Sequence, residues 1–148
     1  MHTGVRAYGE MVGLLWKATE YTAAISLEQL WNDLLKKSDI CLFCAYPIDV
    51  FSSEFQFGQV DALLSAHTHL LPVDGALEGA LHRAMDEVLG SRAASLRPLV
   101  QDHHRPAWGK LPKAEALVLW LRNNLPGSAE EILTRAREYY QPLAIVRF

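Results

Sequence analysis

The chain has 148 residues, half of them hydrophobic, with two cysteines and a formal net charge of -3. This length suits one compact domain, or two smaller units that share a core, and it needs no disulfide bonds for stability. The charge excludes a basic nucleic-acid-binding protein, and no apolar run approaches the roughly 20 residues that span a bilayer. The N-terminus lacks a signal-peptide pattern, so we expect a cytoplasmic protein that contacts neither nucleic acid nor membrane.

The first third of the chain predicts two helices. Val12, Leu15 and Trp16 share one side of a helix from about Gly9 to Lys17. A second helix is expected over 22–37, where apolar residues recur at helical spacing. Its stripe consists of Ala23, Leu27, Leu30, Trp31 and Leu34. We expect this stripe, and Trp31 above all, to face the core.

A strand is predicted from Ile40 to Tyr46, where Pro47 ends an almost continuous apolar run. Such a run is typical of a strand in a parallel sheet that is covered on both faces. One strand makes no sheet, so a partner is required. The candidates are a short strand at Thr3–Ala7 and a β-prone segment at Leu143–Phe148. A loop and a helix from about Gln56 to Leu70 complete an α/β unit.

From Val73 onward the pattern is helical. Apolar residues recur every three or four positions up to Gly90, which can cap a helix in the left-handed conformation. A shorter helix is expected near Leu96–Val100, broken by Pro98 or beginning near it. Two more helices are expected, one from Pro112 to Asn124 and one that starts with a capping box at Ser128–Glu131 and runs to Tyr140.

The predicted fold class is therefore an α/β first half, with the order helix, helix, strand, helix, followed by a mainly α-helical second half. The whole is helix-rich. We divide the chain at 1–72 and 73–148 and expect the two parts to share one core.

The two cysteines, Cys41 and Cys44, have the CxxC spacing of redox and zinc sites. Both lie within the predicted strand, however, where residues three apart point to opposite faces. A redox pair instead needs a helix N-terminus to lower the pKa of its first thiol. Buried, unreactive thiols are the preferred interpretation for both.

The pair His67 and His69 forms an HxH motif near the end of a predicted helix. Two residues apart on a helix, the side chains diverge, whereas helical zinc-binding histidines lie at i and i+4. Capping or surface histidines are favoured, because a helix C-terminus attracts positive charge. If the helix ends before Thr68, the two histidines could converge on a metal with Cys44 or Glu10.

Four sequence blocks carry a family resemblance: VRAYGEMVGLLW from Val5, AAISLEQLWNDL from Ala23, CLFCAYP from Cys41 and AHTHLLP from Ala66. In this order they resemble the second half of the MEDS domain, a sensory module of methanogens, methylotrophs and a dichloromethane-responsive regulator. The resemblance covers about residues 5–72. It includes Glu10 in the family's GEM block, and Glu28 in its LEELWN-like helix.

The resemblance implies a prokaryotic signal-transduction protein that senses small organic molecules and works with a signalling partner. A pocket for a hydrocarbon derivative could be lined by Trp16, Trp31, Phe43 and Tyr46, although aromatic residues at such spacing are more often core. From Val73 onward no residue corresponds to the family pattern.

We expect Glu10, Cys44, Tyr46 and His67 to border one ligand cavity. Ligands of open α/β sheets bind outside the carboxyl ends of the strands, and Tyr46 ends one strand while Glu10 begins a neighbouring helix. No catalytic residue, metal or cofactor is expected at this site. Phosphate-loop, nucleophile-elbow and zincin motifs are all absent from the sequence.

Three functions remain open. The leading hypothesis is a non-enzymatic sensory or regulatory protein that forms a homodimer, because half of the usual module is missing and apolar faces would otherwise be exposed. The alternative is a helical interaction or dimerisation module whose sensor half is degenerate. The third is a metal-dependent enzyme that uses His67, His69 and Cys44, with Glu10 as its base.

Overall fold

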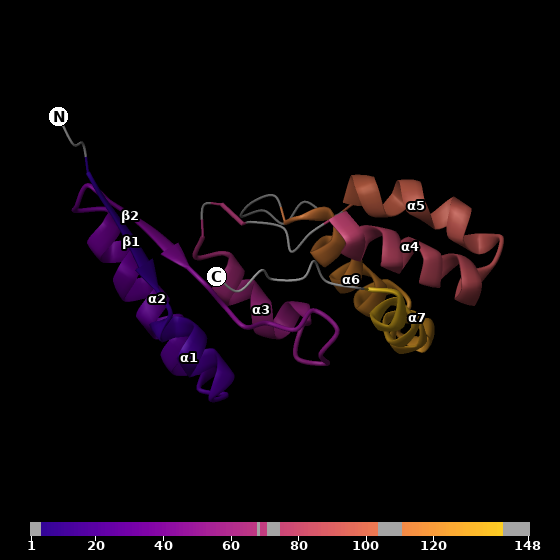
Figure 1. Cartoon of the computed structure of the whole chain (residues 1–148), viewed down its shortest axis with the longest axis horizontal. Helices are drawn as coiled ribbons and strands as arrows, with labels where there is room; N and C mark the ends of the chain where they lie inside the picture. The colour runs from indigo at the N-terminus through magenta and orange to yellow at the C-terminus, as the bar shows by residue number, and fades with distance from the viewer. Residues whose placement is uncertain (1–3, 68, 71–74, 104–110, 141–148) are drawn as a thin grey trace, which may run out of the picture.

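The computed structural model describes residues 4–67, 69–70, 75–103 and 111–140. In this part the chain forms seven helices and two strands (Figure 1). They follow in the order β1 (Val5–Gly9), α1 (Met11–Lys17), α2 (Tyr21–Leu35), β2 (Ile40–Cys44), α3 (Phe57–Leu64), α4 (Gly75–Leu89), α5 (Arg92–His103), α6 (Lys113–Asn124) and α7 (Pro126–Tyr139). The expected fold class, an α/β first half and a helical second half, is confirmed. No helix within the described ranges is long and apolar enough to cross a membrane.

The sheet contains β1 and β2, which run parallel with Val5 opposite Ile40 and Gly9 opposite Cys44. The strand predicted at Thr3–Ala7 is thus present as β1, and α1 and α2 form the crossover between the strands. The alternative partner, Leu143–Phe148, lies outside the described residues.

The prediction that β2 is covered on both faces is wrong. Helices α1 and α2 cover one face of the sheet only. On the other face, side chains from both strands are exposed, namely Arg6, Tyr8, Cys41 and Phe43. The rings of Tyr8 and Phe43 stack there, with centroids 5.8 Å apart. A hydrophobic run therefore indicated a strand correctly, but it did not indicate how many layers cover it.

The apolar stripe predicted for α2 is also partly wrong. The buried residues of this helix are Ala24 and Glu28, whereas Leu30 and Leu34 are 67% and 46% exposed. Trp31 is half-buried and packs against the margin of the core. Apolar residues occupy more than one side of α2, and the inward side is the one on which the Glu28 carboxylate finds hydrogen-bonding partners.

Helix α1 lies close to the end of β2. A Cβ atom at Gly13 would come within 2.5 Å of the Ala45 carbonyl oxygen, a contact that the protein backbone cannot relieve cheaply. Gly13 therefore permits the close approach that fixes α1 against the segment leading to Tyr46.

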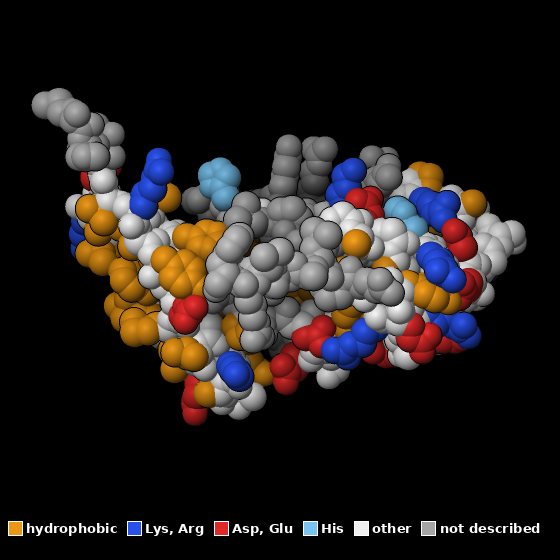
Figure 2. All heavy atoms as spheres, viewed as in Figure 1, with side chains coloured by type: hydrophobic (Ala, Val, Ile, Leu, Met, Phe, Trp, Pro, Cys, Tyr) orange, Lys and Arg blue, Asp and Glu red, His pale blue; other side chains and the backbone are white. Residues whose placement is uncertain are grey.

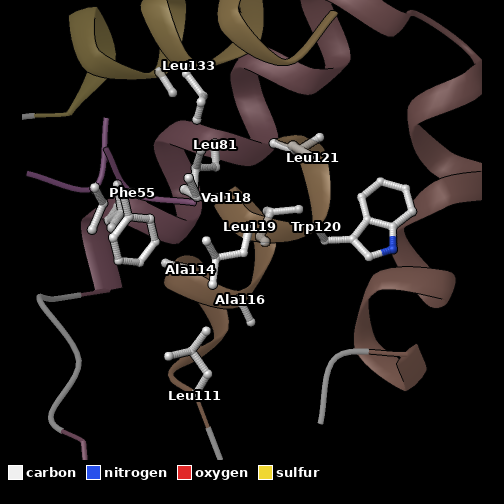
Figure 3. Close-up of a cluster of buried hydrophobic side chains, with 14 of the residues drawn as sticks. Phe55, Leu81, Leu111, Ala114, Ala116, Val118, Leu119, Trp120, Leu121 and Leu133 are labelled. Carbon is white, nitrogen blue, oxygen red and sulfur yellow. The ribbon is translucent and has the colours of Figure 1, made fainter. Parts of the chain in front are cut away.

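The helices α4 to α7 form a bundle around α6 (Figure 1). Every residue of α6 from Ala114 to Leu121 is buried, so this helix has no solvent face along that stretch. Figure 3 shows Leu81 and Leu133 of the neighbouring helices beside Val118, and Trp120 pointing away from that contact. A helix that is buried on all sides needs neighbours on all sides.

Two predicted helix boundaries in this half need correction, and one is confirmed. Pro98 lies inside α5 rather than at a break. Helix α7 begins at Pro126, so the capping box at Ser128 is not used; a proline at the first position loses no helical hydrogen bond. Gly90 does adopt the left-handed conformation expected of a C-cap, with φ of 56°.

The segment between β2 and α3 connects the two halves. Arg122 of α6, whose side chain is only 9% exposed, donates to the backbone carbonyls of Phe51 (3.0 Å) and Phe55. The Phe55 ring lies among the buried side chains of the bundle (Figure 3). One hydrophobic cluster accordingly runs from Val12 of α1 to Ala136 of α7.

Candidate functional site

A buried carboxylate, Glu28, is the centre of the candidate site. It lies on the inward side of α2, faces the end of β2 and is only 3% exposed. A carboxylate taken out of water is costly unless it is hydrogen-bonded or paired with a charge. The contacts of Glu28 therefore show what the surrounding residues can do.

Tyr46 and His67 are two of these partners. The Tyr46 hydroxyl donates a hydrogen bond to Glu28 Oε1 and also lies 3.2 Å from His67 Nε2. His67 Nε2 is 3.6 Å from Glu28 Oε1. The tyrosine and histidine rings meet edge to face, with an interplanar angle of 88°. The three side chains thus meet around one point, although they come from α2, the end of β2 and the segment after α3.

The backbone orients the imidazole of His67. Its Nδ1 lies 2.9 Å from the carbonyl oxygen of Leu63. A carbonyl only accepts, so Nδ1 must carry the proton in this contact. In the neutral ring, Nε2 then presents its lone pair to Glu28 and Tyr46. A second contact holds the same turn in place, since Asn32 Nδ2 donates to the Ala66 carbonyl at 3.0 Å.

Cys44 completes the cluster, with its thiol within 4.8 Å of the nearest ligand atoms of Glu28 and His67. Burial, together with the charge of Glu28 and a hydrogen bond to it, raises the pKa of the Cys44 thiol to about 11. Burial also raises the pKa of Glu28, against the opposing effects of His67 and of the Cys44 hydrogen bond. Without a bound cation, the cluster therefore favours a protonated thiol.

The structure brings Cys44, Tyr46 and His67 together near the end of β2, but of these three only His67 also lines the groove described below. Glu10 does directly follow β1, but it is exposed and accepts a hydrogen bond from Tyr8 at 2.8 Å. The carboxylate of the cluster is Glu28 instead. Sequence reasoning missed its role, although the spacing places Glu28 three residues before Trp31 on the same helix.

In both the CxxC and the HxH motif, the two residues lie in different surroundings. Cys41 is exposed on the bare face of the sheet, which corrects the expectation that both thiols are buried, while Cys44 faces α2. Helix α3 ends at Leu64, so His67 and His69 both follow it. His67 is half-buried within the cluster, and His69 is exposed.

A groove of about 600 Å³ opens beside the cluster, and His67 belongs to both. Its walls come from α2 and from the end of α3, and polar groups predominate: Gln29, Asn32, Asp33, Lys36, Ser65, Ala66 and His67. The four aromatic residues considered for an apolar pocket are dispersed. Trp16 packs on Tyr21 in the core, and Phe43 is exposed on the sheet.

Three ligating atoms in the cluster could hold a metal ion. One atom each from Glu28, Cys44 and His67 lie within 4.8 Å of one another. His69 is not part of this group, so the three-residue set considered from the sequence, which included both histidines, does not form.

Residues 1–68 match a protein-family model, described as MEDS, the methanogen/methylotroph, DcmR sensory domain. The match supports the family that the sequence resembles, over the N-terminal part of the chain. It does not support the narrower assignment to the second, C-terminal half of the domain. No curated protein and no solved structure matches the chain. The family description indicates a role in sensing or signalling.

Proposed function

We propose that the protein is a non-enzymatic sensory module that binds a small organic ligand in the groove beside His67. The position of His67 carries this proposal: its ring borders the groove and also contacts Glu28 and Tyr46 in the buried cluster. A ligand that hydrogen-bonds to His67 from the groove would compete with these contacts. Ligand binding would then change the side-chain contacts at the end of β2.

The lining of the groove selects the ligand class. The amides of Gln29 and Asn32 and the charges of Asp33 and Lys36 offer both donors and acceptors. They suit a small molecule with a hydroxyl, carbonyl or amine group better than an unsubstituted hydrocarbon. The bound state would be passed to a signalling partner through the elements that His67 contacts.

The test is a titration of isotope-labelled protein with methanol, formate, methylamine and dichloromethane, followed by two-dimensional NMR. At least one of the three polar probes should shift the amide signals of Asn32, Ala66 and His67 in a saturable manner. His67→Gln should abolish or strongly weaken this response, whereas His82→Gln on α4 should not. Absence of a saturable response to all four probes, or an equal response in His67→Gln, would contradict the proposal.

We also infer that the chain forms a homodimer through the bare face of the sheet. The exposed large hydrophobic residues of the described part all belong to β1, α1, α2 and β2: Val5, Tyr8, Met11, Leu14, Leu30, Leu34 and Phe43. Figure 2 shows hydrophobic side chains gathered on this end of the molecule. A two-stranded sheet is marginal by itself, and a second copy would supply the missing layer.

Light scattering of the Tyr8→Thr/Phe43→Thr variant tests this inference. The wild type should have the mass of a dimer at micromolar concentration, and the variant that of a monomer with unchanged helicity. Leu30→Thr is the matched control, because Leu30 lies on the helix layer that covers the opposite face. A monomeric wild type would overturn the dimer, and a monomeric Leu30→Thr with a dimeric sheet variant would move the interface to α2.

A further inference from the structure

We propose that Glu28, Cys44 and His67 form a binding site for a divalent transition-metal ion, with Zn²⁺ as the preferred occupant. The site lies beside the groove and shares His67 with it, but it does not depend on an organic ligand being bound there. It assigns a role to the polar atoms that meet in the interior of the N-terminal unit.

The donor set is the first argument. A thiolate, an imidazole nitrogen and a carboxylate are the three side-chain ligands that zinc uses in proteins. The thiol disfavours Mg²⁺ and Ca²⁺, which prefer oxygen ligands, whereas thiolate with imidazole favours zinc and its neighbours in the transition series.

The distances are the second argument. Zinc bonds of about 2.0 to 2.3 Å in a tetrahedron place neighbouring ligand atoms roughly 3.3 to 3.8 Å apart. Glu28 Oε1 and His67 Nε2 are 3.6 Å apart, which already satisfies this spacing. All three ligand atoms lie within 4.8 Å of one another, so a contraction of roughly 1 Å at the widest pair would close the set. The Tyr46 hydroxyl or a water could occupy the fourth position.

The environment of the imidazole is the third argument. Zinc-binding histidines commonly donate their second nitrogen to a carbonyl or carboxylate, which fixes the tautomer and aims the lone pair. The contact between His67 Nδ1 and the Leu63 carbonyl at 2.9 Å provides this arrangement. Nε2, the nitrogen that faces Glu28, is then the ligating atom.

The three ligands come from separate elements, namely α2, the end of β2 and the turn after α3. An ion bound between them would join all three, and occupancy would stabilise the N-terminal unit by mass action. The divided motifs supply matched controls within the same chain. Cys41 shares the CxxC with Cys44 but lies on the opposite face, and His69 shares the HxH with His67 but lies outside the cluster.

The experiment uses the full chain, stripped with a chelator and titrated with Co²⁺ and then with Zn²⁺ against a chromophoric competitor. One Co²⁺ per chain should give an intense near-ultraviolet thiolate-to-cobalt band and the visible bands of tetrahedral coordination. Loss of a residue that only hydrogen-bonds to a metal ligand typically weakens a site by about 10- to 100-fold. Loss of a ligand itself should cost at least as much, so Cys44→Ser and His67→Gln should each weaken Zn²⁺ binding by about 100-fold or more. Cys41→Ser and His69→Gln should bind like the wild type.

Circular dichroism of each metal-free variant shows whether it folds, and the cobalt spectrum of the wild type gives an answer that needs no variant. Three outcomes overturn the proposal: no stoichiometric binding at micromolar metal, a cobalt complex without a thiolate band, or equal losses in Cys44→Ser and Cys41→Ser. None of these outcomes bears on the groove, which is tested by the response to organic probes.

Discussion

The two halves of the molecule differ most in their surfaces and in how the interior is composed, because the exposed large hydrophobic residues of the described part all lie in the N-terminal unit. The helical bundle buries the stretch Ala114–Leu121 of α6, in which every residue except Glu115 is apolar, and its surface carries ion pairs such as Arg97 with Asp86. The N-terminal unit instead exposes Tyr8 and Phe43 and encloses the Glu28 carboxylate. The bundle is built for stability, whereas the N-terminal unit keeps surface for contacts and polar atoms for binding.

The largest effect is expected in the core of the bundle. Leu119 is 1% exposed, and Leu119→Ala should lower the free energy of unfolding by about 2 to 5 kcal/mol because it leaves a cavity. The matched substitution Leu30→Ala, at a side chain 67% exposed, should change it by no more than about 0.5 kcal/mol. Urea denaturation followed by circular dichroism measures both. Similar losses for the two variants would break the contrast between the halves.

The next effect concerns the connection between the halves. Arg122→Ala removes the donors to the Phe51 and Phe55 carbonyls and should cost about 2 to 3 kcal/mol, since these are buried, charge-assisted hydrogen bonds. Arg122→Lys should recover only part of this loss, because an ammonium group lacks the planar fork. Arg135→Ala removes a half-exposed arginine of α7 and should have little effect. The same denaturation measurement would show equal losses at both arginines if the halves were independent.

A smaller effect should depend on pH. The pKa of Glu28 is raised in the fold, so the folded chain keeps a proton that the unfolded chain loses above the ordinary value of 4.5. Stability should therefore decline as the pH rises from about 4.5 through the raised pKa. Thermal denaturation of metal-free protein between pH 4 and 8 should show this decline in the wild type and a flatter profile in Glu28→Gln. Glu10→Gln is the exposed control, and a wild-type profile in Glu28→Gln would contradict the burial argument.

The smallest expected effect is a difference in reactivity between the thiols of Cys41 and Cys44. With a pKa of about 11, only about one Cys44 thiol in 1000 is ionised at pH 8, and the thiolate is the reactive form. In metal-free protein, iodoacetamide should therefore modify the exposed Cys41 at least about tenfold faster than Cys44. Peptide mass spectrometry over time gives both rates. Faster modification of Cys44 would show that the cluster is open to solvent and the thiol ionised.

The sequence predicted the element types well because periodicity reports local structure. It placed β2 and most of the helices within a few residues of their bounds, and Gly90 at a left-handed C-cap. It could not predict that one face of β2 is bare, because a run such as Ile40–Cys44 is equally apolar in a two-layer and a three-layer fold. Pro98 within α5 shows that the surrounding helix can accommodate a proline that local preference places at a boundary.

The candidate site was partly predictable for a related reason. Cys44, Tyr46 and His67 follow from topology, since the carboxyl end of a strand gathers nearby loops. Glu28 does not, because hydrophobic periodicity assigns a glutamate to the outside of a helix. Only the three-dimensional arrangement shows that the inward side of α2 is the one that carries a carboxylate.

The contacts of Arg122 have a further consequence for how the connecting segment tolerates change. The guanidinium binds backbone carbonyls, which every residue type provides, so it places no chemical demand on the side chains of the polar stretch Ser52–Glu54. It does require the carbonyls of residues 51 and 55 to stay at a fixed separation. Substitutions at Ser52, Ser53 or Glu54 should consequently be accepted with little loss, whereas insertion or deletion of a single residue there would separate the two halves.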